Sequence, residues 1–280
     1  MKRIYFVFLF SVFSLLGLAQ NKKIDTANLL CSYVYEYLTD TLSGEQQRKE
    51  DLLYLQIGAE CSKCYSYYTY QCDSLMASPN GDKLWDSFLT EAVGKGLKGK
   101  QLYNAIPHRR MSATIYKNYP QGKITVTDFL LGQYYLYEDA LNSQEWNIES
   151  DSMKVVLGHE CQKATCSFRG RQWTAWFALD VPVSDGPWKF CGLPGLIMEV
   201  YDRGKQYYFC INGMQQVSAK PITFGVLDKE FKRFQKTSRK ELLQSKYKYL
   251  KNRNSINEAS TGISLGGSDE ALKYDLIEKE

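Results

Sequence analysis

The sequence predicts a mainly β (α+β) fold: a curved antiparallel sheet or partly open barrel, with one packed amphipathic helix and a C-terminal basic helix. Short runs rich in Tyr, Val, Ile and Thr follow one another with turn-forming residues between them, which is typical of consecutive strands. Helical periodicity appears in only two places. The 280 residues are 44% hydrophobic and 24% charged, as in ordinary soluble proteins, which excludes a disordered chain and a polytopic membrane protein.

The N-terminus has the features of a secretory signal peptide over residues 1–19. Lys2 and Arg3 precede an apolar run that extends to Leu18, and small residues stand at the cleavage positions Gly17 and Ala19. The first cysteine, at position 31, lies too far from this cut to be an acylated lipoprotein cysteine. We therefore expect an exported protein, located in the periplasm or associated with the outer membrane.

A single β-rich domain is expected over residues 20–227. Strand-like sequence runs from Asn28 to about Tyr70, and a helix then begins at Ser78-Pro79 as N-cap and first-turn proline. Its apolar residues recur at helical spacing, and we expect them to pack on the sheet rather than to face a partner. These residues are Trp85, Phe88, Leu89, Ala92 and Val93.

Strands return after this helix. Residues 113–117 and 123–127 flank a turn that contains Pro120 and Gly122, so they predict a hairpin. Arg169-Gly170 and Arg203-Gly204 occupy turn positions between later strands. Those strands are expected around residues 134–138, 154–157, 162–168, 171–178, 196–202 and 206–212.

The C-terminal region is basic and then polar. Between Lys229 and Arg253 ten Lys and Arg face only Glu230 and Glu241, a local net charge of 10 − 2 = +8, and a basic helix is expected over 228–253. It is interpreted first as a helix lying on the sheet, and alternatively as a peripheral membrane contact or a dock for an acidic protein face. Residues 254–280 are expected to form a mobile polar tail. The Gly-x-Ser-x-Gly match at Ser264 is interpreted as accidental, since no histidine follows it.

Eight cysteines remain after signal cleavage, and in an exported protein an even number favours disulfides. The sequence does not choose among 105 connectivities, although Cys161 and Cys166 should point to opposite faces of one strand. Cys61 and Cys64, with Cys72 nearby, leave a redox or metal-binding role as an alternative. The disulfide candidates are Cys31, Cys61, Cys64, Cys72, Cys161, Cys166, Cys191 and Cys210.

One segment of the chain reads Gly192-Leu193-Pro194-Gly195-Leu196-Ile197. It resembles the signature of the GLPGLI family, exported bacterial proteins named for that hexapeptide. The similarity continues upstream through Phe168-Arg169-Gly170-Arg171, Ala175-Trp176-Phe177 and Gly186-Pro187-Trp188-Lys189-Phe190. With weaker likeness from residue 28, it covers most of the chain up to about residue 215. The resemblance implies an envelope location and association with TonB-dependent outer-membrane transporters, and it implies no established activity.

The residues of this segment describe a rigid bent loop, because its glycines permit unusual backbone angles and its prolines fix theirs. The first interpretation is that the loop plugs the mouth of the curved sheet and fills the core. The alternative is a binding site for a peptide, a lipid or a protein. Its candidate residues are Trp188, Lys189, Gly192, Leu193, Pro194 and Gly195, with Arg169, Arg171 and Trp176 nearby.

The sequence thus favours a non-enzymatic envelope binding or accessory protein, acting with a TonB-dependent transporter or binding a peptide or lipid. No cofactor is expected, and export makes nucleic acid a poor target. With only two histidines, at 108 and 159, most acid–base and metal chemistry is hard to build. The alternatives are a periplasmic hydrolase using the carboxylates Glu138, Asp139 or Glu160, and a thiol- or metal-handling protein.

Overall fold

The computed structural model describes residues 21–39, 48–228, 231–252, 255, 256, 259 and 275–279. The predicted signal peptide and the motif around Ser264 lie outside the described residues. None of the helices in the described part of the chain combines the length and apolar character that a bilayer crossing requires.

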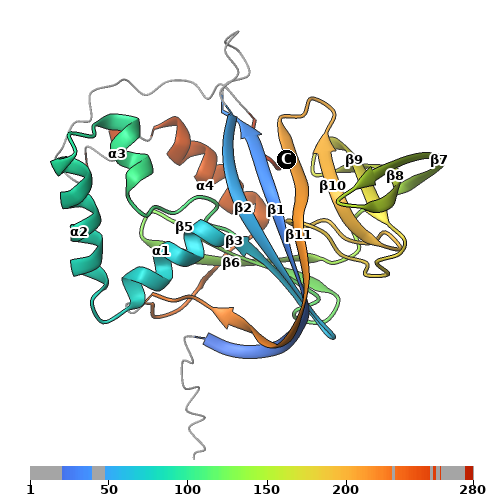
Figure 1. The fold of residues 1–280 in the computed structure, drawn as a ribbon, viewed down its shortest axis with the longest axis horizontal. Coiled ribbons are helices and arrows are strands. Elements are labelled where there is room, and N and C mark those ends of the chain that lie inside the picture. Colours follow the sequence, from blue (N-terminus) through green and yellow to red (C-terminus); the bar gives the residue numbers. More distant parts are fainter. Residues whose placement is uncertain are drawn as a thin grey trace, which may run out of the picture.

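Twelve strands form one large curled sheet in the described part of the chain (Figure 1). Neighbouring strands are antiparallel except for the short parallel pair β12–β6, and the order is β12-β6-β5-β4-β3-β2-β1-β11-β10-β9-β8-β7. The strands are β1 Asn21–Leu38, β2 Arg48–Gly58, β3 Ser62–Ser66, β4 Thr114–Lys117, β5 Lys123–Leu130, β6 Gln133–Ala140, β7 Asn147–Val156, β8 His159–Phe168, β9 Arg171–Ala178, β10 Leu196–Asp202, β11 Tyr207–Gly225 and β12 Gln235–Lys236. The predicted curved antiparallel sheet is confirmed.

The predicted hairpins are present in this sheet. β4 pairs with β5 through Thr114↔Thr127, and Arg169 and Gly170 form the tight turn between β8 and β9, both with positive φ. Along β9 buried residues alternate with more exposed ones, the period of two that a strand with one covered face requires.

The first helical region differs from the prediction. Helix α1 (Tyr67–Ala77) follows β3 directly, because the Ser66 hydroxyl caps it by accepting a hydrogen bond of 3.1 Å from the amide of Thr69. Ser78 is then the C-cap of α1, and the amphipathic helix α2 (Gly81–Gly94) starts two residues later than expected, with Asn80 at its N-cap. A short helix α3 (Gly99–Ala105) follows.

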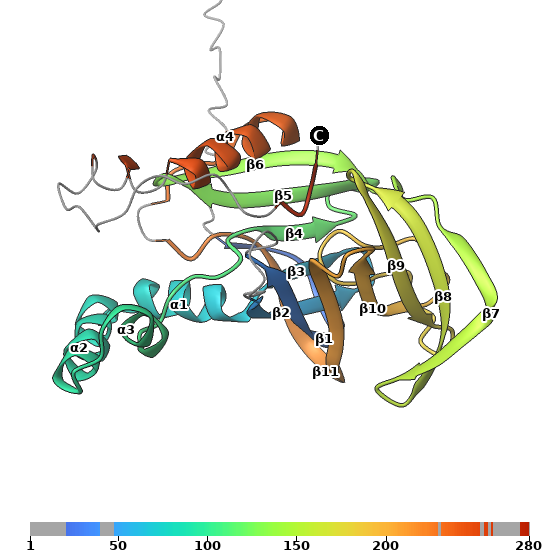
Figure 2. The same cartoon turned by 90° about the horizontal axis from the view of Figure 1, so that it is seen from above.

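The expected packing of the amphipathic helix on the sheet is wrong. Helix α2 contacts α1 and α3, and it is α1 that reaches β2 and β3. Figure 2 shows the three helices projecting from one side of the sheet. Helix α1 thus lies between α2 and the sheet. The apolar residues of α2 are only partly covered, since Phe88 is 39% and Val93 56% exposed.

The C-terminal helix α4 (Arg239–Lys251) lies on the sheet along β6 (Figure 2). It begins at Arg239 rather than at 228, because Ser238 and Glu241 form a reciprocal capping box. Leu242 is buried on its inner face, and Lys246 pairs with the buried carboxylate of Asp128. The main core fills the curl of the sheet, with its largest buried side chains including Trp173, Phe177, Phe190 and Phe209.

Candidate binding site

The signature loop, residues 186–195, connects β9 to β10 and is packed inside the curl of the sheet. Trp188, Phe190 and Leu193 are all buried. The ring of Trp188 packs edge-to-face with Phe168, and that of Phe190 packs edge-to-face with Trp173. The loop therefore contributes core residues, as the plug interpretation expects, while Gly192 and Pro194 stay exposed.

Side chains from other strands hold the backbone of this loop. Lys117 of β4 pairs with Asp185 and donates to the carbonyl oxygens of Gly186 and Phe190, the latter at 3.2 Å. The amide of Trp188 donates to the sulfur of Cys64 over 3.3 Å. These contacts satisfy polar groups that would otherwise be buried without partners.

Two positions in the loop need special backbone properties. Gly192 has a φ of +94°, which L side chains rarely adopt. At Gly195 a Cβ atom would lie 2.0 Å from the carbonyl oxygen of Ala178, so only glycine fits against β9.

A cavity of about 390 Å³ lies between the sheet and helix α4. Helix α4 contributes Leu242 and Leu243 to its wall, and the opposite side is mostly aromatic and aliphatic. Two ion pairs, Lys189 with Glu278 and Lys246 with Asp128, also line the cavity, together with Arg110 and Ser112. A mostly apolar cavity with a few convergent polar groups is the usual form of a ligand site. Its lining includes Tyr35, Tyr37, Met111, Ile115, Val126, Leu130, Tyr137, Trp188, Tyr207, Tyr249 and Ile277.

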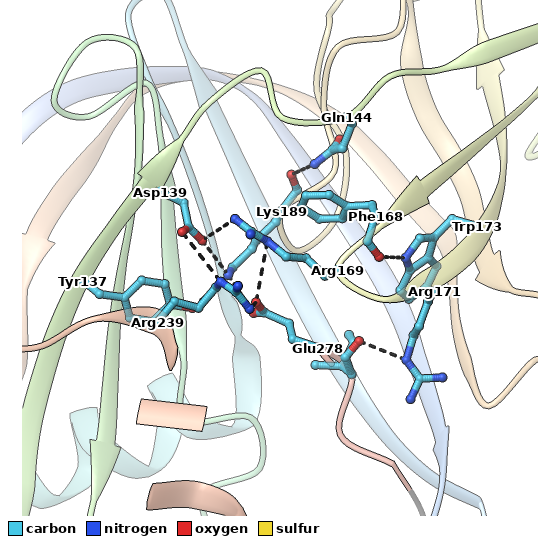
Figure 3. Close-up of polar contacts among 11 residues, drawn as sticks. Tyr137, Asp139, Gln144, Phe168, Arg169, Arg171, Trp173, Lys189, Arg239 and Glu278 are labelled. Atoms are coloured by element: carbon cyan, nitrogen blue, oxygen red, sulfur yellow. Dashed lines mark hydrogen bonds and ion pairs between the residues drawn. The ribbon is translucent and has the colours of Figure 1, made fainter. Parts of the chain in front are cut away.

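Five charged residues form a cluster at the Lys189–Glu278 end of the cavity (Figure 3). We refer to Lys189, Arg169, Arg239, Asp139 and Glu278 as the charged cluster. The side chain of Lys189 is 1% exposed, and its ammonium lies 2.6 Å from Glu278 Oε1 and 3.1 Å from Asp139 Oδ2. Arg169 contacts Asp139 at 3.0 Å, and Arg239 lies 3.6 Å from Glu278. A buried charge of this kind persists only when it is paired.

Tyr137 completes the surroundings of the lysine. Its hydroxyl oxygen accepts a hydrogen bond of 2.8 Å from Lys189 Nζ. Burial, followed by the nearby Glu278 and Asp139 carboxylates, raises the pKa of Tyr137 well above its ordinary value. The phenol therefore stays neutral at physiological pH and acts here as a hydrogen-bond acceptor for the ammonium.

Glu278 belongs to a C-terminal segment, residues 275–279, that is held by side chains of β9 and of the turn between β10 and β11. Arg171 donates to the carbonyl oxygens of Ile277 at 3.0 Å and Leu276 at 2.7 Å, and Gln206 donates to that of Asp275 at 2.8 Å. This packed segment departs from the predicted mobile tail over 254–280, because Glu278 finds three cationic side chains around its carboxyl group.

The structure brings four of the predicted binding residues together: Arg169, Arg171, Trp188 and Lys189 surround the C-terminal segment or the adjoining cavity. It does not bring Trp176 to them. Positions 171 and 176 on β9 differ by an odd number and lie on opposite faces of the strand, so Trp176 instead faces Lys154, whose ammonium is 4.7 Å from its ring. Leu193 and Gly195 are buried in the core, away from any surface.

The carboxylates considered for hydrolysis are dispersed. Glu138 and Asp139 point to opposite sides of β6, as expected for neighbours on a strand: Glu138 pairs with Lys123 on the exposed side and Asp139 enters the charged cluster. Glu160 is exposed on β8. These three do not form a carboxylate pair around a common cleft.

All eight cysteines are free in the structure, and none of the expected disulfides is present. Burial raises the pKa of Cys61 to about 12 and that of Cys64 to about 11, which opposes the thiolate that a redox pair would need. Among the described residues no group of three or more His, Cys, Asp and Glu side chains is arranged to hold a metal ion.

Comparison with known proteins gives limited matches. A family model described as a protein of unknown function (Porph_ging) matches residues 166–199, from the end of β8 through the signature loop to β10. This stretch contains most of the residues that resemble the GLPGLI signature, and membership of that family stays a prediction. No curated protein sequence matches the chain.

Two solved structures of PNGF-II, in space groups P21 and C2, are similar to this chain with TM-scores of 0.48 and 0.46 and 12% sequence identity. Each match covers 78% of this chain, and 33% and 32% of the respective PNGF-II chains. The chain thus spans about a third of the length of the PNGF-II chains that it matches.

Proposed function

We propose that this chain is a non-enzymatic binding protein of the cell envelope, and that its ligand places apolar groups in the cavity between the sheet and α4. The cavity is the observation that carries this proposal. Its volume of about 390 Å³ lies within the range of small-molecule and peptide side-chain sites. The rigid sheet holds one wall, and α4 supplies the other.

The charged cluster supports binding rather than acid–base chemistry. A general acid or base needs an ionisable group free to exchange its proton with a substrate. Here Lys189 is held by Asp139, Glu278 and Tyr137 at hydrogen-bonding distance. Such a fixed charge orients a ligand, which is the role of the few polar groups in a mostly apolar site.

Binding of a neutral apolar fluorophore such as N-phenyl-1-naphthylamine tests the cavity. Val126 lies in the wall and is 2% exposed, so Val126→Phe fills the space and should abolish the fluorescence rise on binding. Val155→Phe is the matched control, because Val155 is on the exposed β7 and 67% accessible. Equal binding by the two variants, or no binding by the parent, would contradict the proposal.

The resemblance to GLPGLI proteins supports a further proposal, that this binding protein acts beside a TonB-dependent outer-membrane transporter. A test at the signature loop has to avoid Gly195, because its substitution disturbs β9. Pro194 is exposed on the same loop, and Pro194→Asp changes the surface without entering the core. Affinity capture from cross-linked envelopes should recover a transporter with the parent chain and lose it with Pro194→Asp. Equal recovery would place the contact elsewhere.

A further inference from the structure

The C-terminal segment is bound in the manner of a peptide ligand. Its backbone adds no strand to the sheet. Instead, the side chains of Arg171, Gln206 and Tyr207 donate hydrogen bonds to the carbonyl oxygens of three consecutive residues, 275 to 277. The amide of Lys279 donates to the carbonyl oxygen of Arg169 at 3.0 Å, which fixes the far end. The fit over the β8–β9 turn is close, since a Cβ atom on Gly170 would lie 2.6 Å from Lys279 Cβ.

The side chains of the segment divide between two environments. Leu276 and Ile277 line the apolar cavity, and Glu278 enters the charged cluster beside it. The segment therefore presents two aliphatic residues followed by a carboxylate. This order fits the site, in which an apolar cavity adjoins three cations.

Glu278 fills the cationic end incompletely. Its Oε1 accepts from Lys189 at 2.6 Å, but its Oε2 lies 3.8 Å from Arg169 Nε and 3.6 Å from Arg239 Nη1, beyond hydrogen-bonding distance. Glu278 Oε2, Arg169 Nε and Arg239 Nη1 are buried and have no hydrogen-bond partner among the described residues. The cluster also holds three cations against two carboxylates, a net charge of +3 − 2 = +1. Buried donors without acceptors are costly, so an anion placed slightly differently would bind here more favourably than Glu278 does.

We propose that this is a recognition site for a peptide that carries two aliphatic residues followed by an acidic residue, and that the chain's own residues 276–278 occupy it in cis. The inference rests on the proposed function, because the aliphatic side chains use the same cavity. The three donors to consecutive carbonyl oxygens favour a peptide over a fatty acid, which offers a carboxylate and no backbone carbonyl groups. Binding in trans requires that the C-terminal segment leave the site.

The test uses the full-length chain and a fluorescein-labelled peptide with the sequence of residues 274–279. Glu278→Gln weakens the cis contact by removing the charge that meets Lys189, so it should bind the peptide more tightly than the parent, on the order of tenfold. Asp275→Asn is the matched control, because it removes a carboxylate that is 59% exposed in the same segment. Its affinity should equal that of the parent. Ile277→Ser is a second releasing variant, which keeps the charged cluster intact and should also bind more tightly than the parent.

Two further arms decide the chemistry. The same peptide with glutamine in place of its glutamate should bind at least tenfold more weakly to the Glu278→Gln chain, and sodium dodecanoate should not displace the labelled peptide. Equal affinity of the two peptides, equal affinity of all four chains, or displacement by dodecanoate would overturn the proposal. Fluorophore binding that is lost in Val126→Phe, with no peptide binding, would refute the peptide site and leave the proposed function standing. Absence of both would refute the proposed function as well.

Discussion

Replacing Lys189 by methionine tests whether the charged cluster holds the fold together. Methionine keeps most of the length of the side chain and removes the ammonium, which contacts Glu278 at 2.6 Å, Tyr137 at 2.8 Å and Asp139 at 3.1 Å. The cluster changes from three cations and two carboxylates to two and two. Removing one partner of a buried ion pair costs about 3–5 kcal/mol. Because Arg169 and Arg239 remain beside both carboxylates, we expect the lower end, about 3 kcal/mol.

Urea denaturation measures this loss. For a slope of about 2–3 kcal/mol/M, a loss of about 3 kcal/mol lowers the midpoint by about 1–1.5 M. Lys123→Met is the matched control: Lys123 pairs with Glu138, the neighbour of Asp139 on β6, but these two side chains are 49% and 40% exposed. An exposed pair contributes about 0.2–1 kcal/mol. If Lys189→Met cost no more than Lys123→Met, the cluster would not be the buried, mutually dependent unit described above.

Three further predictions concern the loop, a buried lysine and the thiols. Gly195→Ala should lower the free energy of unfolding by about 1–3 kcal/mol or more, because the new Cβ atom meets the carbonyl oxygen of Ala178. Gly94→Ala is the control, since no atom lies within 4 Å of the position of its Cβ. Equal melting temperatures of the two variants would contradict the close packing at Gly195. Burial lowers the pKa of Lys63 from 10.5 to about 8, so between these pH values the folded chain binds fewer protons than the unfolded chain and its stability rises with pH. The parent should therefore gain stability relative to Lys63→Met from about pH 8 to 9.5. A stability difference that does not change with pH would refute this prediction. Thiol titration in denaturant without reductant should find eight free thiols. A count of zero would show that the cysteines are paired in disulfides, as the sequence suggests.

The sheet could be predicted because its strands carry local signals. The hairpin of β4 and β5 follows from its turn residues, and the β8–β9 turn from Arg169-Gly170, where Gly170 adopts positive φ without cost. The order of the strands could not be predicted, since β1 pairs with β11 about 180 residues away and nothing local records that partner. Helix α1 was missed because its tyrosines favour strands, while its start depends on a single capping serine.

Of the candidate site, the sequence could predict the residues of the β8–β9 turn and the signature loop, but not the residues that pair with them. Arg169, Arg171, Trp188 and Lys189 stand near one another in sequence and in the resemblance to a known signature, so they could be grouped in advance. Their partners come from remote, polar stretches. Glu278 lies in the polar C-terminal region, and its burial depends on three cations from distant parts of the chain, which no local sequence pattern records.

The stability and binding experiments together distinguish a structural cluster from a ligand site. Buried ion pairs contribute little net stability compared with well-packed apolar residues, and a joint apolar replacement of such a pair is often neutral or stabilising. Lys189→Met/Glu278→Leu removes one cation and one carboxylate, so the cluster keeps its net charge of +1 while the Lys189–Glu278 pair disappears. If the pair only holds the C-terminal segment in place, this double variant should recover most of the stability lost in Lys189→Met and bind no peptide in trans. If Lys189 also recognises the carboxylate of a ligand, the single variant Glu278→Leu, which retains Lys189, should bind the peptide in trans and be less stable than the double variant. A site with an exchangeable ligand requires both effects in Glu278→Leu: lower stability of the free chain and tighter binding of the peptide in trans.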